Sequence, residues 1–348
     1  MLSNLSAMLD RLGQYDRALS VIQRAVTIQE GALGPNDPQL ALSLSVMGMV
    51  HMERGDLRAG KASHQRALAI LERVAPNEPD YATILGNVGT AAYKLGEYDE
   101  ALADHERALA LRDRIFGPDN PATAKQLIEV GDVLAALGRT EAALDDDQKG
   151  LAVLERKLGP AHTDVAWAHH SLGDALARQH RYADALKHYR TAQDIFTKAL
   201  GPDHVNVALV HRDIGEVLLR QGRPAEALAE EERALVMFEK ALGPDHLDLA
   251  YPETGVGQAR LALRQPEQAV PPLSRALARR QAHDCAPVDL GETQFALARA
   301  LWESSRDATR ARSLAANARD VYAKAGPGAS AELAEVDAWL AATFRTGP

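Results

Sequence analysis

The sequence predicts an all-α solenoid of about eight stacked helix pairs followed by a C-terminal capping helix. The main observation is a glycine that recurs at steps of 41 or 42 residues, here called the frame glycine: Gly48, Gly89, Gly131, Gly173, Gly215 and Gly257. Small residues also recur at fixed offsets after it, and the turns between the predicted helices hold glycine and proline. Small residues at such offsets let two helices cross closely and stack on the next pair. A stack of this kind is first of all a binding surface.

The second and third small residues complete the repeat frame. Twelve residues after each frame glycine stands Gly60, Ala101, Ala143, Ala185, Ala227 or Ala269. Seven residues further on stands Ala67, Ala108, Gly150, Ala192, Ala234 or Ala276. Segments such as Asp99–Phe116 and Pro224–Leu242 place Ala and Leu at three- and four-residue spacing, which is typical of amphipathic helices. No segment shows a convincing strand pattern.

Glycine and proline mark the helix ends. The short turn inside each pair has Gly13, Gly55, Gly96, Gly138 or Gly222, with His180 and Arg264 at the equivalent points. The longer loop between pairs contains Gly-Pro, as in Gly117-Pro118 and Gly201-Pro202. Glycine can close a helix in the left-handed conformation, and the proline after it cannot continue that helix. We expect Pro38, Pro79, Pro121, Asp164, Asn206 and Asp248 to be first-turn or cap residues of the next helix.

These marks divide the chain into a solenoid, residues 1–325, and a capping helix with a tail, residues 326–348. The predicted repeats are approximately 1–35, 36–77, 78–118, 119–160, 161–202, 203–244, 245–287 and 288–325. Residues 329–344 read as the capping helix, with Trp339 and Leu340 on its apolar side. Met1 falls inside the first helix without a cap. This indicates either that the chain was once part of a longer protein or that its first helix frays.

The last two repeats depart from the frame. Pro271-Pro272 stands where the second helix of repeat seven should be under way, and an interior proline costs about 3 kcal/mol. We therefore expect this helix to start late or to kink. The eighth pair keeps Ala311 and Ala318 but loses the frame glycine. Both departures are expected of decay toward a terminus, and a hinge or docking edge is the alternative.

Composition narrows the function further. The chain has a formal net charge of −9 and a pI near 5.8, which argue against a nucleic-acid or anionic-membrane surface. A single cysteine, Cys285, excludes an intrachain disulfide framework and fits a reducing compartment. The N-terminal residues lack the pattern of a signal peptide, and no apolar run is long enough to cross a bilayer. A cytoplasmic location is the expectation.

The repeat resembles a known family. The small-residue frame, with segments such as Leu95-Gly96-Glu97-Tyr98-Asp99-Glu100-Ala101, is similar to the tetratricopeptide repeat, whose usual period is 34 residues. The longer unit with a Leu-Gly-Pro-Asp-His loop, at 200–204 and 242–246, resembles the kinesin light chain variety. The segment 331–340 looks like the end of arrays appended to bacterial Ser/Thr kinases. The resemblance implies a right-handed superhelix that binds proteins or peptides.

Three segments resemble catalytic or metal-binding motifs, but each lacks a required residue or has a simpler structural explanation. Residues 55–62 match most of a phosphate-binding loop, but Ala62 stands where a Ser or Thr belongs and a helix precedes it. His105-Glu106 begins a zinc-protease pattern that ends at Leu109. Cys285 with His283 and Asp284 could form a thiol or metal site, although a free structural cysteine explains it more simply. We expect no enzyme activity, no metal and no cofactor.

Three loop histidines, His162, His204 and His246, are spaced by 42 residues. They could form a row of pH-sensitive or metal-binding groups along one edge. Successive repeats are about 20 Å apart, however, which is too far to share an ion. The favoured interpretation is that each side chain closes its own turn.

The inner face of the solenoid is the predicted binding site. By family analogy, the first helix of each pair lines a groove that is small or apolar in the early repeats and charged from repeat four onward. The candidate residues are Lys125, Asp132, Trp167, His170, Asp174, Arg212, Glu216, Tyr251 and Gln258. An aromatic anchor beside desolvated charges is typical of an interaction hot spot. The alternative is structural: His170–Asp174 and Arg212–Glu216 could satisfy each other, and Trp167 could pack between repeats.

Two classes of function stay open. The first is a non-enzymatic scaffold that holds a protein or peptide of mixed charge in the groove. The second is a regulatory or sensor region of a larger bacterial signalling protein such as a Ser/Thr kinase. Self-association through the repeats is possible in either setting. The inward-facing basic residues are few and interleaved with acids, so a clamp for a C-terminal carboxylate is not expected.

Overall fold

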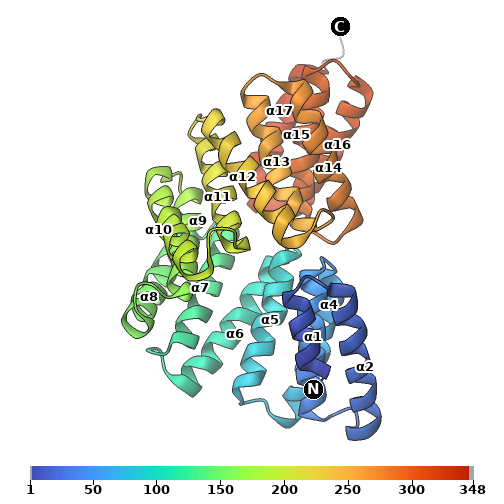
Figure 1. Ribbon diagram of the computed structural model, residues 1–348. Coiled ribbons are helices and arrows are strands. Elements are labelled where there is room, and N and C mark those ends of the chain that lie inside the picture. Colours follow the sequence, from blue (N-terminus) through green and yellow to red (C-terminus); the bar gives the residue numbers. More distant parts are fainter. Residues whose placement is uncertain (1, 345–348) are drawn as a thin grey trace. The chain divides into compact units, whose positions relative to one another are not determined.

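The computed structural model describes residues 2–344, which hold seventeen α-helices and no strand (Figure 1). The predicted all-α fold class is confirmed. Met1, which the sequence places in the first helix, and residues 345–348 of the predicted tail lie outside the described residues. The assignment of residues 1–325 to one solenoid and of 326–348 to a cap stays a prediction.

The helices follow one another in pairs. They are α1 (Leu2–Arg11) and α2 (Tyr15–Leu33), α3 (Pro38–Glu53) and α4 (Leu57–Val74), α5 (Pro79–Lys94) and α6 (Tyr98–Phe116), α7 (Pro121–Ala136) and α8 (Thr140–Leu158), α9 (Thr163–Arg178) and α10 (Tyr182–Leu200), α11 (Val205–Arg220) and α12 (Pro224–Leu242), α13 (Ala250–Ala262) and α14 (Pro266–Ala282), and α15 (Pro287–Glu303) and α16 (Ala308–Ala325). A 3₁₀ turn, η1 (Leu247–Leu249), precedes α13; a second, η2 (Gly326–Ala329), precedes the last helix, α17 (Ser330–Thr343).

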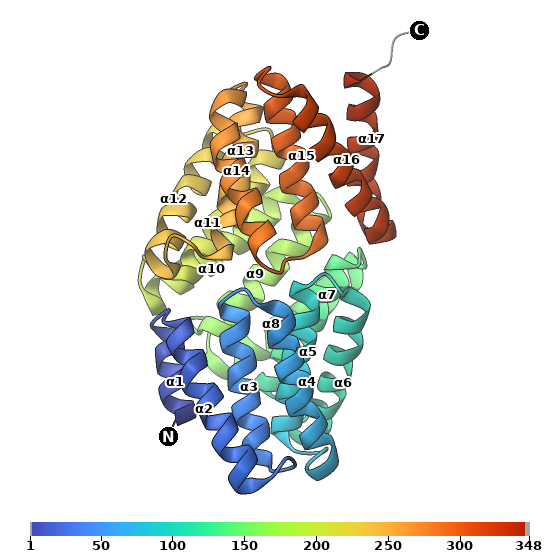
Figure 2. The same ribbon diagram turned by 90° about the vertical axis from the view of Figure 1, so that its right-hand side faces the viewer.

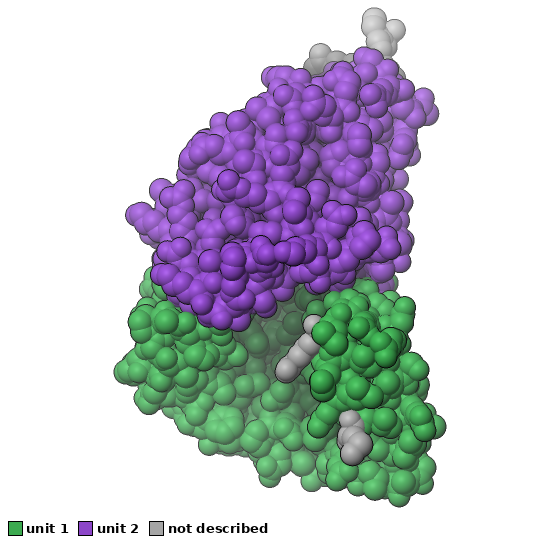
Figure 3. Space-filling model, in the orientation of Figure 1, with its two compact units in different colours: residues 1–175 green, residues 176–348 purple. Residues whose placement is uncertain are grey.

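The chain forms two compact units, Met1–Ala175 and Leu176–Pro348 (Figure 3). Within unit 1, α3 packs on α4, α5 on α6 and α7 on α8, and each pair packs on the next. Within unit 2, α11–α12, α13–α14 and α15–α16 do the same. The first helices also contact each other directly, as α1 with α3 and α3 with α5 in unit 1, and α11 with α13 and α13 with α15 in unit 2. The first helices of each unit therefore form one continuous layer.

The frame glycines permit this close packing. A β-carbon on Gly48 would lie 2.7 Å from the His64 ring, and one on Gly257 would lie 2.3 Å from Leu273. Contacts below 3 Å are too close for real side chains, so an alanine at either position would force the helices apart. The second and third small residues are likewise buried in the pair interfaces.

The turn positions have the backbone conformation that their residues predict. The turn glycines have positive φ, as at Gly138 (+77°) and Gly222 (+72°). His180 and Arg264, which replace glycine in two repeats, adopt φ of 60° as well. Ser305 has φ of 55° in the eighth pair, so this pair keeps the turn although it has lost the frame glycine.

The helix starts are capped in two ways. Pro38, Pro79 and Pro121 occupy the first helical position, as predicted. In later repeats the loop histidine is the cap. The Nδ1 atom accepts a 3.1 Å hydrogen bond from the backbone N–H group two residues later in the case of His162, His204 and His246. The interpretation that these histidines close their own turns is confirmed.

The helix with the double proline does not start late. α14 begins at Pro266 and continues through Pro271 and Pro272 to Ala282, so the prediction of a delayed start was wrong. Each proline removes a hydrogen bond to the carbonyl four residues earlier, at Glu267 and Gln268. Both residues lie exposed in the first helical turn. Water can therefore hydrate the two carbonyls that lose a partner.

The C-terminal end of unit 2 has its own core. Val336 of α17 is fully buried in a core that also contains residues of α15 and α16, and Leu333, Trp339 and Leu340 pack against this core. The Trp339 ring meets Phe295 edge-on with 5.7 Å between ring centroids. Figure 2 shows α17 beside α16, where it covers the last pair. None of the helices within residues 2–344 is long and apolar enough to cross a membrane.

Candidate functional site: the first-helix face

The first-helix face is the layer of α1, α3, α5, α7 and residues 163–175 of α9 in unit 1, and of α11, α13 and α15 in unit 2. Polar side chains link neighbouring helices along it. In unit 1, Asn87 donates to Ser45 at 3.4 Å and Lys125 donates to Asp164 at 2.9 Å. In unit 2, the hydroxyl oxygens of Thr254 and Thr293 are 3.0 Å apart and share a hydrogen bond. Many polar residues on this face thus join one repeat to the next.

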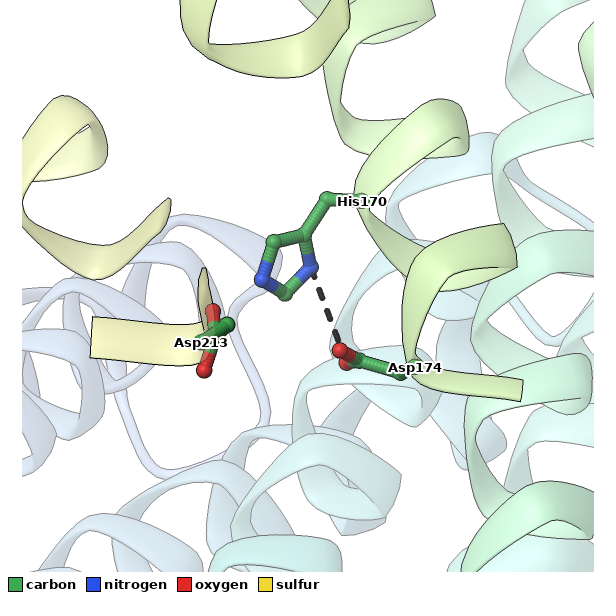
Figure 4. Close-up of side chains that lie close together, drawn as sticks. All are labelled: His170, Asp174 and Asp213. Carbon is green, nitrogen blue, oxygen red and sulfur yellow. Dashed lines mark ion pairs between the residues drawn. The ribbon is translucent and has the colours of Figure 1, made fainter. Parts of the chain in front are cut away.

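Four of the predicted site residues gather at the α7–α9 end of unit 1. His170 is buried, and its Nδ1 lies 3.7 Å from Oδ2 of Asp174 one turn on (Figure 4). Trp167, on the same helix, is 37% exposed and meets the His170 ring edge-on at 5.5 Å. Asp132 of α7 is half-buried and hydrogen-bonds to Ser171. Asp213, also drawn in Figure 4, belongs to unit 2 and is described with it.

Lys125, the fifth predicted residue of unit 1, does not join this group. Its Nζ donates to Asp164 at 2.9 Å, and half of its side chain is exposed. Lys125 therefore neutralises the first turn of α9 rather than the carboxylates further along that helix.

The predicted residues of unit 2 take partners that the sequence did not indicate. Arg212 donates two hydrogen bonds to Oδ1 of its neighbour Asp213, at 2.8 and 2.6 Å. Glu216 pairs with Arg220 at 2.9 Å. Arg212 can reach Asp213, its neighbour in sequence, because the long arginine side chain folds back along the helix surface.

Tyr251 and Gln258 link α13 to α15. The Tyr251 hydroxyl donates to Asp289 at 2.9 Å, and the Gln258 amide donates to Glu292 at 2.9 Å. The guanidinium groups of Arg212 and Arg280 lie 5.1 and 4.6 Å from the Tyr251 ring centroid, within the range of cation–π attraction. Burial raises the pKa of Tyr251 to about 12, so its hydroxyl stays a donor at neutral pH.

Sequence reasoning missed a row of buried side chains that faces the frame glycines. Sixteen residues after each frame glycine, the second helix of the pair presents one side chain: His64, His105, Asp147, Tyr189, Glu231 and Leu273. All are at most 3% exposed. Four of these six side chains are histidine or carboxylic acid at a position where the frame alone predicts an apolar residue. The fixed offset was the signal that could have identified them.

The histidines of this row are held neutral or hydrogen-bonded. Burial lowers the pKa of His64 to about 4, and its Nδ1 lies 3.4 Å from the Ser45 hydroxyl. His105 Nδ1 lies 2.8 Å from the Gln126 amide of the next first helix. His64 is therefore a polar core residue within the α3–α4 pair, and His105 connects the α5–α6 pair to α7.

Asp147 lacks the hydrogen bonds that the two histidines make. The side chain is 1% exposed, and neither carboxylate oxygen has a hydrogen-bond partner. A β-carbon on Gly131 would lie 2.3 Å from its Oδ1, so the carboxyl group rests on the α7 backbone beside Asp132. Burial, together with the charges of Asp132, Asp174 and Asp146, raises the pKa of Asp147 to about 9. Burial and Asp174 raise the pKa of Asp132 to about 7.

Glu231 has the equivalent position in unit 2. The side chain is 3% exposed and lies between Gly215 and Gly255, where added β-carbons would come within 2.7 and 2.3 Å of it. Burial raises the pKa of Glu231 well above its ordinary value, although Arg212 opposes the rise. Asp147 and Glu231 thus place one buried acid in each unit behind the first-helix face.

The apparent motifs have structural roles. Gly55 forms the turn between α3 and α4, and a β-carbon on Gly60 would lie 2.7 Å from Met52, so this segment is a packed helix pair. Lys61 pairs with Glu100 at 2.7 Å and also with Glu97. The Sγ of Cys285 lies 3.6 Å from the carbonyl oxygen of Arg280.

Comparisons with known proteins agree with this description. A family model described as tetratricopeptide repeat matches residues 1–73, 80–156, 126–193, 164–240 and 214–282. No curated protein matches the sequence. The match confirms the repeat family predicted from the sequence.

Three solved structures are similar to this chain, and the first two share its fold. A Rap protein complexed with competence and sporulation factor is 13% identical, with a TM-score of 0.65 over 99% of this chain and 98% of that one. The Cut9–Hcn1 hetero-tetramer of the APC/C gives 14% identity and a TM-score of 0.60, over 96% of this chain and 55% of that one. A putative kinesin light chain with TPR-like repeats from Podosopora anserina is 18% identical, with a TM-score of 0.49 over 57% of this chain and 93% of that one.

Proposed function

We propose, from the premise that this chain belongs to the tetratricopeptide repeat family, that it is a non-enzymatic scaffold that binds a peptide or partner protein on its first-helix face. Repeat arrays of this kind use a continuous helix layer as an extended binding surface. The likeness to the Rap protein complexed with competence and sporulation factor concerns the fold alone. The partner's chemistry must therefore be inferred from this chain's own residues.

Trp167 is the observation on which the proposal chiefly depends. It is a large aromatic side chain, 37% exposed, on the first-helix face of unit 1. His170 meets its ring edge-on, and the carboxylates of Asp174 and Asp132 lie on the same surface. Exposed tryptophan beside partly desolvated charges is the composition in which binding energy concentrates. Unit 2 adds Arg212 and Tyr251, so a partner of mixed charge fits the proposal best.

Pull-down of partners from an extract of the source cells tests the proposal. We expect the Trp167→Ala variant to lose its partners by about tenfold or more, because truncation of a hot-spot aromatic costs about 2 kcal/mol or more. The Arg212→Ala/Glu216→Ala variant should weaken binding through unit 2. Each variant is first checked for an unchanged helical circular dichroism spectrum and melting temperature.

Phe116→Ala is the matched control. Phe116 is an aromatic of the same unit with a similar exposed fraction, 41%, but it lies at the end of the second helix α6. Partners that survive Phe116→Ala and disappear with Trp167→Ala would support the first-helix face. Equal retention by both variants would place the binding surface elsewhere.

The same surface would serve a regulatory or sensor region of a larger signalling protein. In that setting the pull-down result is the same, but the consequence of binding is a change in the activity of the attached domain. Sequence upstream of the chain that encodes a Gly-rich loop and a His-Arg-Asp segment would identify a kinase.

A further inference from the structure

We propose that unit 2 has a second binding site, for a small organic carboxylate, in the cavity between α10, α11 and α12. The cavity has a volume of about 240 Å³, and α11 packs on both of the other helices. The polar residues that carry the argument are Arg190 and Gln193 of α10, His211 of α11, and Glu230 and Arg233 of α12.

The cavity lies on a different side of α11 from the first-helix face. His211, Ile214 and Leu218 line the cavity and follow one another at three- and four-residue spacing. Arg212 and Glu216, which belong to the first-helix face, lie about a third of a turn or more away from them around the helix. The inference is therefore independent of the proposed function.

Two polar residues of the cavity replace leucines of the repeat. Twenty residues after the frame glycine, five of the six pairs have a leucine: Leu68, Leu109, Leu151, Leu235 and Leu277. The remaining pair has Gln193. Four residues before the frame glycine, the first three of these pairs also have leucine, whereas α11 has His211. In unit 1 the equivalent Leu68 and Leu85 pack in one hydrophobic core, so the repeat frame does not require polar groups here.

A chain of hydrogen bonds joins the three helices at the cavity. The Gln193 amide nitrogen lies 3.0 Å from Nε2 of His211, and Nδ1 of His211 lies 2.5 Å from Oε2 of Glu230. Both the imidazole and the carboxylate are half-buried. This hydrogen bond, together with the charges of His211, Arg233 and Arg190, lowers the pKa of Glu230. The polar wall is thus already in place before a ligand enters, as is usual for small-molecule sites.

The two arginines leave hydrogen-bond donors available at the cavity. No hydrogen bond or ion pair joins Arg190 to another described residue, although its charge acts on Glu226 and Glu230. Arg233 donates to Glu230 only at 3.5 Å, the limit of a hydrogen bond. The acids are engaged, because Glu226 accepts bonds of 2.7 and 2.6 Å from Arg223, and Glu230 belongs to the chain described above. This balance favours a ligand that accepts hydrogen bonds and carries negative charge.

A carboxylate on an apolar body matches this cavity best. A guanidinium group binds a carboxylate through two parallel hydrogen bonds. The acids Glu226 and Glu230 would repel a doubly charged phosphate more strongly than a singly charged carboxylate. Ile214 and Leu218, both buried, give the cavity an apolar side. Since a cavity of about 150 Å³ holds benzene, this cavity has room for one ring and a short acidic stem.

Titration of the full chain with 3-phenylpropionate, followed by saturation-transfer NMR of the ligand, tests the inference. We expect saturable binding with a Kd of about 1 mM or lower, as is usual for a ligand with about a dozen non-hydrogen atoms. 3-Phenylpropanol has the same ring and stem without the charge, and it should bind at least about tenfold more weakly. Acetate, which has the charge without the ring, should also bind at least about tenfold more weakly.

Matched variants locate the bound molecule. Arg190→Gln should weaken the binding of 3-phenylpropionate about tenfold, whereas Arg310→Gln, at an exposed arginine of α16, should leave it unchanged. Ala229→Phe places a ring at the exposed edge of the cavity and should abolish binding. Ala241→Phe, at an exposed alanine of the same helix outside the cavity, is its control. Circular dichroism and thermal melts establish that each variant is folded.

Three results would overturn the inference. Binding that survives Ala229→Phe would place the ligand elsewhere, and equal affinity for 3-phenylpropanol would remove the role of the charge. The third is the lack of saturable binding by 3-phenylpropionate and by phenylacetate and 4-phenylbutyrate, which have a shorter and a longer stem. Partners that depend on Trp167 report on the first-helix face, so the failure of one proposal leaves the other standing.

Discussion

At the scale of the residue, the main finding is the row of side chains that faces the frame glycines. The space left by a missing β-carbon is filled by an imidazole at Gly48, by a carboxyl group at Gly131 and by a leucine at Gly257. The same geometry therefore accepts polar or apolar groups, at very different electrostatic cost. An apolar filler costs nothing in desolvation, whereas a carboxyl group must be neutral or paired.

The first prediction concerns the pH dependence of Asp147. Its pKa in the folded protein is about 9, well above the ordinary value of 3.8. Between these values the folded state binds one more proton than the unfolded state, so the free energy of unfolding should fall as the pH rises. Asp147→Asn removes this dependence and should stabilise the protein at pH 8 by about 1–3 kcal/mol, with little effect at pH 4.

Thermal unfolding at pH 5 and pH 8 checks this prediction. The melting temperature of the Asp147→Asn variant should exceed that of the unaltered protein mainly at pH 8. Asp145→Asn, which changes an exposed acid two residues away, should shift it little at either pH. A variant that is less stable at pH 8 would mean that the ionised carboxylate is required for folding.

At the scale of the element, each helix pair depends on one turn residue with positive φ. Glycine fills this position in most repeats, but His180, Arg264 and Ser305 hold it in others. An L-residue in the left-handed conformation costs about 1–2 kcal/mol, and the packing of the two helices imposes it regardless. Packing likewise maintains α14 through Pro271 and Pro272.

The second prediction follows from that turn. Arg264→Gly should stabilise unit 2 by about 1 kcal/mol, because it removes the conformational cost from an exposed residue. The reverse type of change, Gly138→Ala in unit 1, should destabilise by a similar amount. A β-carbon there meets nothing within 4 Å, so only the backbone conformation is affected. Urea-induced unfolding followed by circular dichroism measures both, and equal signs would contradict the argument.

At the scale of the whole molecule, stability should be distributed along the stack. Each pair contacts chiefly its neighbours in sequence, and a repeat array behaves as a sum of repeat and interface terms. A local defect should therefore loosen adjacent pairs and leave distant ones unchanged. This behaviour would also let the first-helix face of one unit bind a partner while the other unit keeps its structure.

Gly257→Val tests this distribution. A β-carbon at residue 257 would lie 2.3 Å from Leu273, so valine should separate α13 from α14. We expect faster amide hydrogen exchange in α12–α15, measured by mass spectrometry, and unchanged protection in α3–α6 of unit 1. Uniform loss of protection along the chain would instead indicate a single cooperative unit.

The sequence by itself determined the repeat, the turns and the small-residue frame. These features are local or periodic. Spacing alone therefore identifies Gly48 as a helix-packing residue, Gly138 as a turn residue and Pro121 as the first residue of a helix. The positions of the predicted site residues on the first helices followed from the same period. Their partners did not, because the spacing does not indicate that Arg212 bonds Asp213 or that Glu216 pairs with Arg220.

Only the tertiary structure decided which polar residues lose contact with water. In the sequence, Asp145, Asp146 and Asp147 are three consecutive aspartates on one predicted amphipathic helix. The crossing of α7 and α8 at Gly131 buries Asp147 and leaves Asp145 exposed, and the cost of a buried charge then gives them different chemistry. Burial is therefore a property of the assembled helices.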